Sequence, residues 1–349
     1  MSSTDQCFER ACAIMREAVA SGECASAVMG IANSRETLRL EAASPADGSE
    51  TAKADSIYLL ASITKTFFGT AMMQLAEQGR LLLTDTVARH IPEFAVNGKG
   101  GVTIWNLLTH TSGLAEEPWM EVWKRQGSQS ELITAVIKAW LNFKPGAQYQ
   151  YCNGSFWILG ELITRISGQA YPDYLRSHIY EPLGMRDTGF SFKGAQAERM
   201  MPVHTWQKEG LLSAPHAVDY YCQVAFGAGG LWSTVPDLIA YGQAHLNALR
   251  GCEPALCSTG GTQMMTRWHT RGINDADGNP SYDGLGWDLD SGNGFCLGRG
   301  NGFGHGSATC SYFWVEPDLD LVFVYVTNMW AYERRASQLA LNAVLAELK

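Results

Sequence analysis

Ser62-Ile63-Thr64-Lys65 follows a short apolar run at residues 57–61 and precedes apolar residues spaced three and four apart across residues 67–76. This spacing predicts a helix, and Gly79 is a typical helix end. Ser62 is therefore expected at or near the N-terminus of that helix. Lys65, three residues later, is expected one turn away on the same face.

A serine and a lysine at this spacing permit two interpretations. In the first, the lysine amine takes the proton of the serine hydroxyl and activates it as a nucleophile, provided that burial lowers the pKa of the amine. The unpaired N–H groups at the helix start would favour negative charge near Ser62. In the second, Ser62 caps the helix and Lys65 is solvated. The four residues alone leave both interpretations open.

Composition narrows the class of protein. The chain has 349 residues, of which 46% are hydrophobic and 17% charged, so it indicates a folded protein with a sizeable core. A net charge of −9 disfavours nucleic acids or anionic membranes as main partners. No apolar stretch reaches the roughly 18 residues of a transmembrane helix.

Two further features bear on the cellular compartment. The N-terminal residues 1–5 lack the basic and apolar regions of a secretion signal. The nine cysteines contain no C-x-x-C pair, which is typical of reduced thiols, although Cys252 and Cys257 could pair across a small loop. Together these features predict a cytoplasmic protein.

The remaining pattern predicts strands at both ends of the chain and helices between them. Strands are expected at residues 27–32, 37–42, 311–316 and 319–327, with further strands from Tyr282 onwards. Helices are expected at residues 5–21, 103–110, 128–142, 156–166, 234–249 and 330–348, and one ending near His178. The fold class is therefore α+β, an antiparallel sheet flanked by terminal helices with a helical region inserted.

Tyr151-Cys152-Asn153 is the first stretch far from Ser62 whose side chains could take part in catalysis. In an extended segment, Tyr151 and Asn153 would point to the same side. A tyrosine whose pKa is lowered by an ammonium group can exchange protons with a reacting oxygen, and an asparagine can bind an amide-like substrate. A buried tyrosine and a turn asparagine are the structural alternative.

Gly304-His305-Gly306-Ser307-Ala308 is the second such stretch, and it follows a glycine-rich approach to a strand. Small residues let a substrate approach the backbone closely. A backbone N–H here, together with that of Ser62, would form an oxyanion hole. A flexible hairpin tip is the alternative.

The three stretches in this order resemble the serine β-lactamase and penicillin-binding-protein superfamily, in the branch with class C β-lactamases, D-amino-acid peptidases and β-lactamase-like carboxylesterases. Its S-x-x-K, Y-x-N and H-x-G motifs correspond to Ser62 with Lys65, Tyr151 with Asn153, and the stretch at His305. Accessory stretches at residues 107–114, 181–185 and 227–233 extend the resemblance over residues 55–330.

The resemblance implies a β-lactamase/transpeptidase-like fold over residues 1–349 with an active site in a cleft. The expected parts are an α/β subdomain at residues 1–60 plus 270–349 and a mostly helical subdomain at residues 61–269. It also implies an acyl-enzyme mechanism. Ser62 would attack, Lys65 and Tyr151 would share the proton transfers, and Asn153 would position the substrate.

The strand motif departs from the family at two positions. Its first residue is His305 where a β-lactamase commonly has lysine, and a mostly neutral histidine holds a substrate carboxylate less strongly. Its third residue is Ser307 where glycine is usual, which would narrow the cleft or add a hydroxyl contact. These departures favour small ester, amide or peptide substrates over β-lactam antibiotics. Gly306, Ser307 and Ala308 would line the substrate and oxyanion region.

Trp119 and Trp123 follow the helical-domain motif and either line an apolar acyl pocket or pack in the core. No P-loop, dinucleotide-binding or H-E-x-x-H pattern occurs, so neither a cofactor nor a metal is expected. The preferred function is a serine hydrolase of the carboxylesterase type. The alternatives are a β-lactamase or D-amino-acid peptidase, an acyltransferase or cyclising thioesterase, and a degenerate penicillin-binding sensor. The oligomeric state is not predicted.

Overall fold

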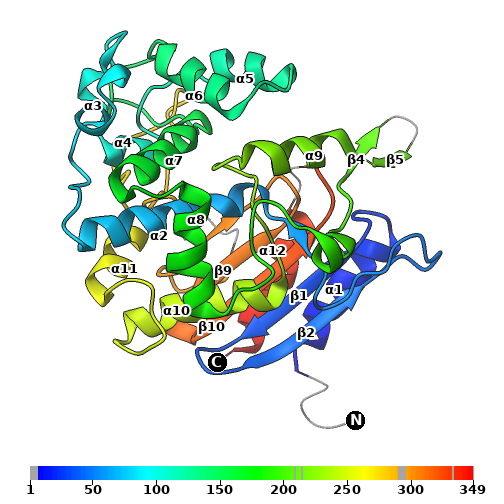
Figure 1. The fold of residues 1–349 in the computed structure, drawn as a ribbon. Helices are drawn as coiled ribbons and strands as arrows, with labels where there is room; N and C mark the ends of the chain where they lie inside the picture. Colours follow the sequence, from blue (N-terminus) through cyan, green and yellow to red (C-terminus); the bar gives the residue numbers. More distant parts are fainter. Residues whose placement is uncertain (1–6, 208–209, 214, 290–295, 332–333, 349) are drawn as a thin grey trace.

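A computed structural model describes residues 7–207, 210–213, 215–289, 296–331 and 334–348. Within these ranges the chain forms an antiparallel sheet of six strands in the order β2-β1-β10-β9-β8-β7 (Figure 1). Its strands are β1 (Ala27–Ala32), β2 (Thr37–Ala43), β7 (Asp288–Leu289), β8 (Phe303–Gly306), β9 (Tyr312–Glu316) and β10 (Leu321–Thr327). The two ends of the sequence thus meet in one sheet, because β1 pairs with β10, and the predicted α+β fold is confirmed.

The terminal helices cover one face of the sheet. Helix α1 (Glu9–Ala20) and helix α12 (Arg335–Glu347) pack against each other, and alternate residues of β1, such as Met29 and Ile31, pack against them. Intervening β1 residues, such as Val28, face the other core. A strand buried on both faces reads as a continuous apolar run, as β1 does.

Helix α10 (Val235–Leu249) covers the opposite face and lies very close to β1 at Gly30. A Cβ atom at Gly30 would lie 2.4 Å from Cγ1 of Val235 and 2.8 Å from Cδ1 of Ile239. The close approach of helix and sheet therefore requires glycine at this position.

The substitution Gly30→Ala is expected to lower the free energy of unfolding by about 1–3 kcal/mol, because the added methyl group overpacks this contact. Denaturant unfolding of the wild type and the variant measures the difference. Gly100→Ala is the control, since a Cβ there meets no atom within 4 Å. Equal losses in the two variants would contradict the packing argument.

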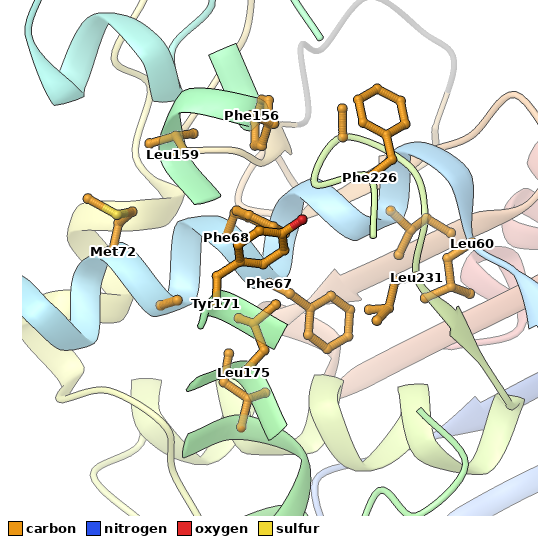
Figure 2. Close-up of a cluster of buried hydrophobic side chains, with 14 of the residues drawn as sticks. Leu60, Phe67, Phe68, Met72, Phe156, Leu159, Tyr171, Leu175, Phe226 and Leu231 are labelled. Carbon is orange, nitrogen blue, oxygen red and sulfur yellow. The ribbon is translucent and has the colours of Figure 1, made fainter. Parts of the chain in front are cut away.

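Helix α2 (Thr64–Glu77) runs through the centre of the molecule, between the sheet and the other helices (Figure 1). Phe67, Phe68 and Met72 on α2 pack against side chains from several segments, among them Tyr171 and Leu231 (Figure 2). All residues of α2 from Thr64 to Leu75 are buried. The helix that follows Ser62 is thus held rigidly on every side.

The remaining helices are α3 (Val87–His90), α4 (Ile104–Leu108), α5 (Glu117–Lys124), α6 (Gln129–Lys138), α7 (Gly154–Ser167), α8 (Tyr171–Leu175), α9 (Pro215–Val224) and α11 (Thr259–Thr266). Of these, α7, α8 and α11 pack directly against α2. None of the helices in the described ranges combines the length and apolar character of a membrane span. Helix α10 packs on the sheet, although its residues fall in the range predicted for the helical subdomain. The predicted boundaries between the two subdomains remain a prediction.

Both predicted hairpins are confirmed, but several element ends differ from the prediction. Helix α6 ends at Lys138 rather than near residue 142, because Ala139 is extended. Helix α12 begins at Arg335 rather than Trp330, and residues 332–333 lie outside the described residues, as do residues 5 and 6 of the first predicted helix. Between residues 282 and 310 the structure shows only the short strands β7 and β8 among the described residues.

Two small ladders were not predicted. Strand β4 (His204–Gln207) pairs with β5 (Gly210–Ser213), and β3 (Tyr58–Leu59) pairs with β6 (Trp232–Ser233). Cys252 and Cys257 are free thiols, so the alternative of a disulfide between them is excluded in this structure.

Candidate active site

Ser62 lies in a short 3-10 turn, Ala61–Ile63, that leads directly into α2. Ala61 has φ of 43°, in the left-handed region that residues other than glycine rarely adopt. Such strain persists only where the surroundings hold it, and it is common at functional sites. The position near a helix start agrees with the prediction from the sequence.

The turn is fixed by the β3–β6 ladder. Beyond the paired strands, the N–H of Leu60 donates to the carbonyl of Leu231 at 2.8 Å, and the N–H of Leu231 donates to Oγ1 of Thr64 at 3.1 Å. The Gly227–Ser233 stretch is therefore bonded to both sides of the Ser62 turn.

Ser62, Lys65 and Tyr151 meet in one hydrogen-bonded group. Nζ of Lys65 donates to Oγ of Ser62 at 3.1 Å, and Oη of Tyr151 donates to the same oxygen at 3.0 Å. Nζ of Lys65 also donates to the carbonyl of Ala228 at 2.8 Å. Three segments that are far apart in the sequence thus converge on one hydroxyl.

Lys65 is fully buried, which excludes the solvated lysine of the structural alternative. Burial lowers the pKa of the Lys65 amine from 10.5 to about 7, although the negative charges of Glu116 and Asp288 oppose the shift. Near neutral pH a large share of the amine is therefore uncharged and has a lone pair for the serine proton.

This pKa predicts the pH dependence of any reaction that needs neutral Lys65. Below pH 7 the amine is protonated, so kcat/KM is expected to fall about tenfold per pH unit on the acid side and to level off above pH 7 to 8. A pH profile of kcat/KM with a substrate that does not titrate in this range measures the limb. If kcat/KM instead fell with a midpoint near pH 4 or near pH 10, Lys65 would not be the group that controls the reaction.

Tyr151 differs from the prediction in its pKa. Desolvation, assisted by the charges of Asp288 and Asp283, raises the pKa of its hydroxyl, while the hydrogen bond with Ser62 only partly opposes this. The prediction of a lowered tyrosine pKa is therefore wrong. Tyr151 keeps its proton at neutral pH and is suited to donate it.

His110 supports the Tyr151 ring from behind. The two rings stack with centroids 4.4 Å apart, and Nδ1 of His110 accepts the N–H of Cys152 at 3.0 Å. Burial lowers the pKa of His110 well below its usual value, so the ring is neutral and can accept this bond.

Asn153 does not continue the extended segment of Tyr151. It has helical φ and ψ of −73° and −31° and precedes the first residue of α7. Its Nδ2 donates to Oε2 of Glu116 at 3.3 Å, and the N–H of Gly154 donates to Oε1 of Glu116 at 2.7 Å. The prediction of an extended segment is wrong at Asn153, yet Asn153 and Tyr151 both line the same cavity.

His305 lies on β8 near Tyr151, with ring centroids 6.4 Å apart. Burial lowers its pKa, while the nearby Asp288 carboxylate opposes the shift. Nδ1 of His305 bonds to the Gly306 carbonyl at 2.6 Å, and the N–H of Gly306 donates to Oδ2 of Asp288 at 3.2 Å. His305 is therefore a neutral side chain engaged with its own strand end.

The two residues after Gly306 point in different directions. The hydroxyl of Ser307 bonds to Oγ1 of Thr309 at 2.6 Å and accepts the N–H of Thr309 at 3.1 Å. Ser307 is buried and does not line the cavity at Ser62, whereas Ala308 does. The expected narrowing of the cleft by the Ser307 hydroxyl is therefore not seen.

A cavity of about 250 Å³ opens at Ser62. Besides Ser62, Tyr151, Asn153 and Ala308, its lining is mainly apolar and includes the aromatic residues Trp119, Trp123, Tyr221, Phe226 and Trp330. Trp119 and Trp123 also pack against each other and against Phe226. Both interpretations of these two tryptophans therefore hold, since they line the cavity and form part of the core.

A larger cavity of about 700 Å³ lies elsewhere, near Trp268 and Phe303, and contains none of these residues.

Three contributors were not identified from the sequence. They are the carbonyl of Ala228, the ring of His110 and the carboxylate of Glu116. Each lies within or just beyond a stretch that resembles the family, but its contact with the Ser62 group depends on the tertiary fold. A sequence does not tell which carbonyl or carboxylate faces a buried amine.

Comparison with known proteins places the fold in context. Protein flp of Staphylococcus aureus strain MW2 is 36% identical over 138 residues, covering 38% of this chain and 28% of that protein. D-alanyl-D-alanine-carboxypeptidase/endopeptidase AmpH of Escherichia coli strain K12 is 31% identical over 206 residues, covering 56% and 50%. The match thus spans half or less of either relative.

Among solved structures, EstCE1, a hydrolase with promiscuous acyltransferase activity, superimposes with a TM-score of 0.84 over 99% of this chain and 100% of the other, at 19% identity. At this identity the likeness shows the fold. The model of one family, Beta-lactamase, matches residues 12–347. The S-x-x-K, Y-x-N and His305-Gly306-Ser307 stretches thus meet in the fold of a known family, and the chain belongs to the beta-lactamase family.

Proposed function

We propose that the protein is a serine hydrolase that acts on small esters or amides through an acyl-enzyme on Ser62. The observation that carries the proposal is that Oγ of Ser62 lies 3.1 Å from a buried lysine amine and 3.0 Å from a tyrosine hydroxyl. Family members are serine hydrolases or acyltransferases, and the described site contains the groups that such chemistry needs.

In the proposed first step, neutral Lys65 takes the proton of Ser62 while Oγ attacks the acyl carbonyl carbon. The backbone N–H groups of Ser62 and Ala308 stabilise the resulting oxyanion. Tyr151 donates its proton to the leaving oxygen or nitrogen, and the Lys65 ammonium restores it. The acyl group stays on Ser62, and both catalytic side chains regain their starting protonation.

In the second step, a water molecule attacks the acyl-enzyme. It gives a proton to Lys65, and the carboxylic acid leaves as the Ser62 hydroxyl re-forms with that proton. Asn153 and His305 are proposed to position the substrate, with Gly306 and Ser307 shaping the strand beside it. Trp119 and Trp123 are proposed to contact the acyl group.

Esters and amides are preferred over β-lactams because the strand motif offers a neutral imidazole in place of a lysine charge. Burial holds His305 in the uncharged form, and its Nδ1 is already bonded to the Gly306 carbonyl. A substrate carboxylate would therefore meet little positive charge from this residue.

The test compares a short-chain 4-nitrophenyl ester with a chromogenic cephalosporin and a D-amino-acid amide. The proposal predicts a higher kcat/KM for the ester than for the cephalosporin, with both lost in Ser62→Ala. Faster turnover of the cephalosporin or the D-amino-acid amide would instead favour a β-lactamase or D-amino-acid peptidase, as AmpH is named. No turnover of any acyl donor would favour a binding sensor.

Acyl transfer is a second candidate, supported by the largely apolar lining of the cavity, which disfavours water. EstCE1 is described as having promiscuous acyltransferase activity. Product analysis with an added alcohol or amine acceptor distinguishes acyl transfer from hydrolysis. A transfer product that exceeds the free acid at millimolar acceptor would identify an acyltransferase.

A further inference from the structure

Glu116 brings a carboxylate into the mainly apolar wall of the Ser62 cavity. It immediately precedes α5 and is half-buried among the lining residues. Its side chain forms no ion pair with any of the residues that the structure describes. Lys124, a cationic residue of the lining, is exposed and pairs with Glu121 at 2.6 Å.

The two oxygens of Glu116 are occupied unequally. Oε1 accepts the N–H of Gly154 at 2.7 Å, Nε1 of Trp119 at 3.0 Å and Sγ of Cys152 at 3.2 Å. Within the described chain, Oε2 accepts only Nδ2 of Asn153, at 3.3 Å. Each carboxylate oxygen offers about two acceptor positions, and Oε2 uses one of them, so it can take a further donor or a cation.

Trp119, which donates to this carboxylate, belongs to a cluster of aromatic rings on the cavity wall. Trp123 contacts Tyr221 and Phe226, each with centroids 4.9 Å apart, and Trp119 lies 5.6 Å from Phe226. Ring faces attract cations, and several rings with one carboxylate form the kind of site that binds ammonium groups. Filling the cavity with a neutral group would instead strip water from Oε2 without replacing it, which costs free energy.

We infer that the acyl pocket selects substrates whose acyl chain ends in a cationic nitrogen, such as a quaternary ammonium group, which Glu116 and the surrounding rings bind. The inference rests on the proposed function, since it names the substrate class of the same site. Glu116 acts in it as a specificity-determining residue, while Ser62 and Lys65 carry the chemistry.

The test uses two 4-nitrophenyl esters of the same shape, 4-(trimethylammonio)butanoate and 5,5-dimethylhexanoate, which differ in a quaternary nitrogen against a carbon. Shorter and longer pairs bracket the reach of the pocket. Measurement at pH 8.5 keeps Lys65 mostly neutral, so its charge does not repel the cation. For the best chain length, we expect kcat/KM of the cationic ester to exceed that of the neutral ester by about tenfold or more.

Glu116→Gln should bring this ratio to about one, because the amide keeps the shape and loses the charge. Glu117→Gln is the matched control, since it removes the same charge from an exposed neighbour that does not line the cavity, and it should keep the ratio. A wild-type ratio of one or less at every chain length, or a ratio unchanged by Glu116→Gln, would overturn the inference.

A binding measurement separates this inference from the proposed reaction. Benzyltrimethylammonium should quench the tryptophan fluorescence of the wild type and bind at least about tenfold more weakly to Glu116→Gln. Binding without ester turnover would sustain the inference and remove the proposed function. Turnover of both esters without a preference, together with equal benzyltrimethylammonium affinity in the two proteins, would sustain the proposed function and overturn the inference.

Discussion

Ser62→Ala is expected to lower kcat/KM for any ester substrate by about 10⁴-fold or more, because no other group in the site can form the acyl-enzyme. The loss should appear in kcat, whereas substrate binding should persist. Steady-state kinetics with a 4-nitrophenyl ester measure the loss. The substitution removes only one oxygen at the surface of the cavity, so the fold should be retained.

Ser49→Ala is the control for this variant, since Ser49 is exposed in a turn with Asp47 and lies outside the cavity. It should have wild-type activity and the same midpoint of thermal unfolding. If Ser62→Ala kept more than a tenth of the wild-type rate, Ser62 would not be the nucleophile.

Lys65→Arg is expected to lower kcat/KM by about 10³-fold or more. A guanidinium stays protonated throughout the accessible pH range, so it keeps a cation beside Ser62 but cannot take the serine proton. The variant should show no recovery between pH 6 and pH 9, where the wild type follows its acid limb. A pH profile of kcat/KM for both proteins measures this.

Burying a larger side chain also costs stability, and a second buried lysine controls for that. Lys99 is fully buried, and its Nζ donates to the carbonyl of Ala139, far from the cavity. Lys99→Arg should lose stability and keep its kcat. Lys65→Ala adds a further check, since small primary amines should restore part of its activity, and full activity without added amine would remove Lys65 from the mechanism.

The sheet and the main helices were predictable because their signals are local. Alternating or continuous apolar runs mark β1, β2, β9 and β10, and Asn33 closes the first hairpin by accepting the N–H groups of Arg35 and Glu36. Short elements were missed because their stability comes from distant partners. The two-residue strand β3 forms only because β6, more than 170 residues later, pairs with it.

The candidate site was predictable as a set of motifs and less so as an electrostatic arrangement. The resemblance of three motifs to a known family pointed to Ser62, Lys65 and Tyr151, which the structure brings together. The direction of the Tyr151 pKa shift could not be predicted, because it depends on the desolvation of the hydroxyl and on the charges of Asp283 and Asp288. The role of Glu116 could not be predicted for the same reason, since its contacts with residues 152–154 are made only in the folded chain.

Intact-mass analysis of the protein during exposure to a panel of esters, β-lactams and D-amino-acid amides tests the acyl-enzyme most directly. The expected result is a single added acyl mass on the wild type, mapped to the peptide that contains Ser62 and lacking in Ser62→Ala. An acyl mass on another residue, or the same added mass on Ser62→Ala, would contradict the central role of the Ser62 hydroxyl.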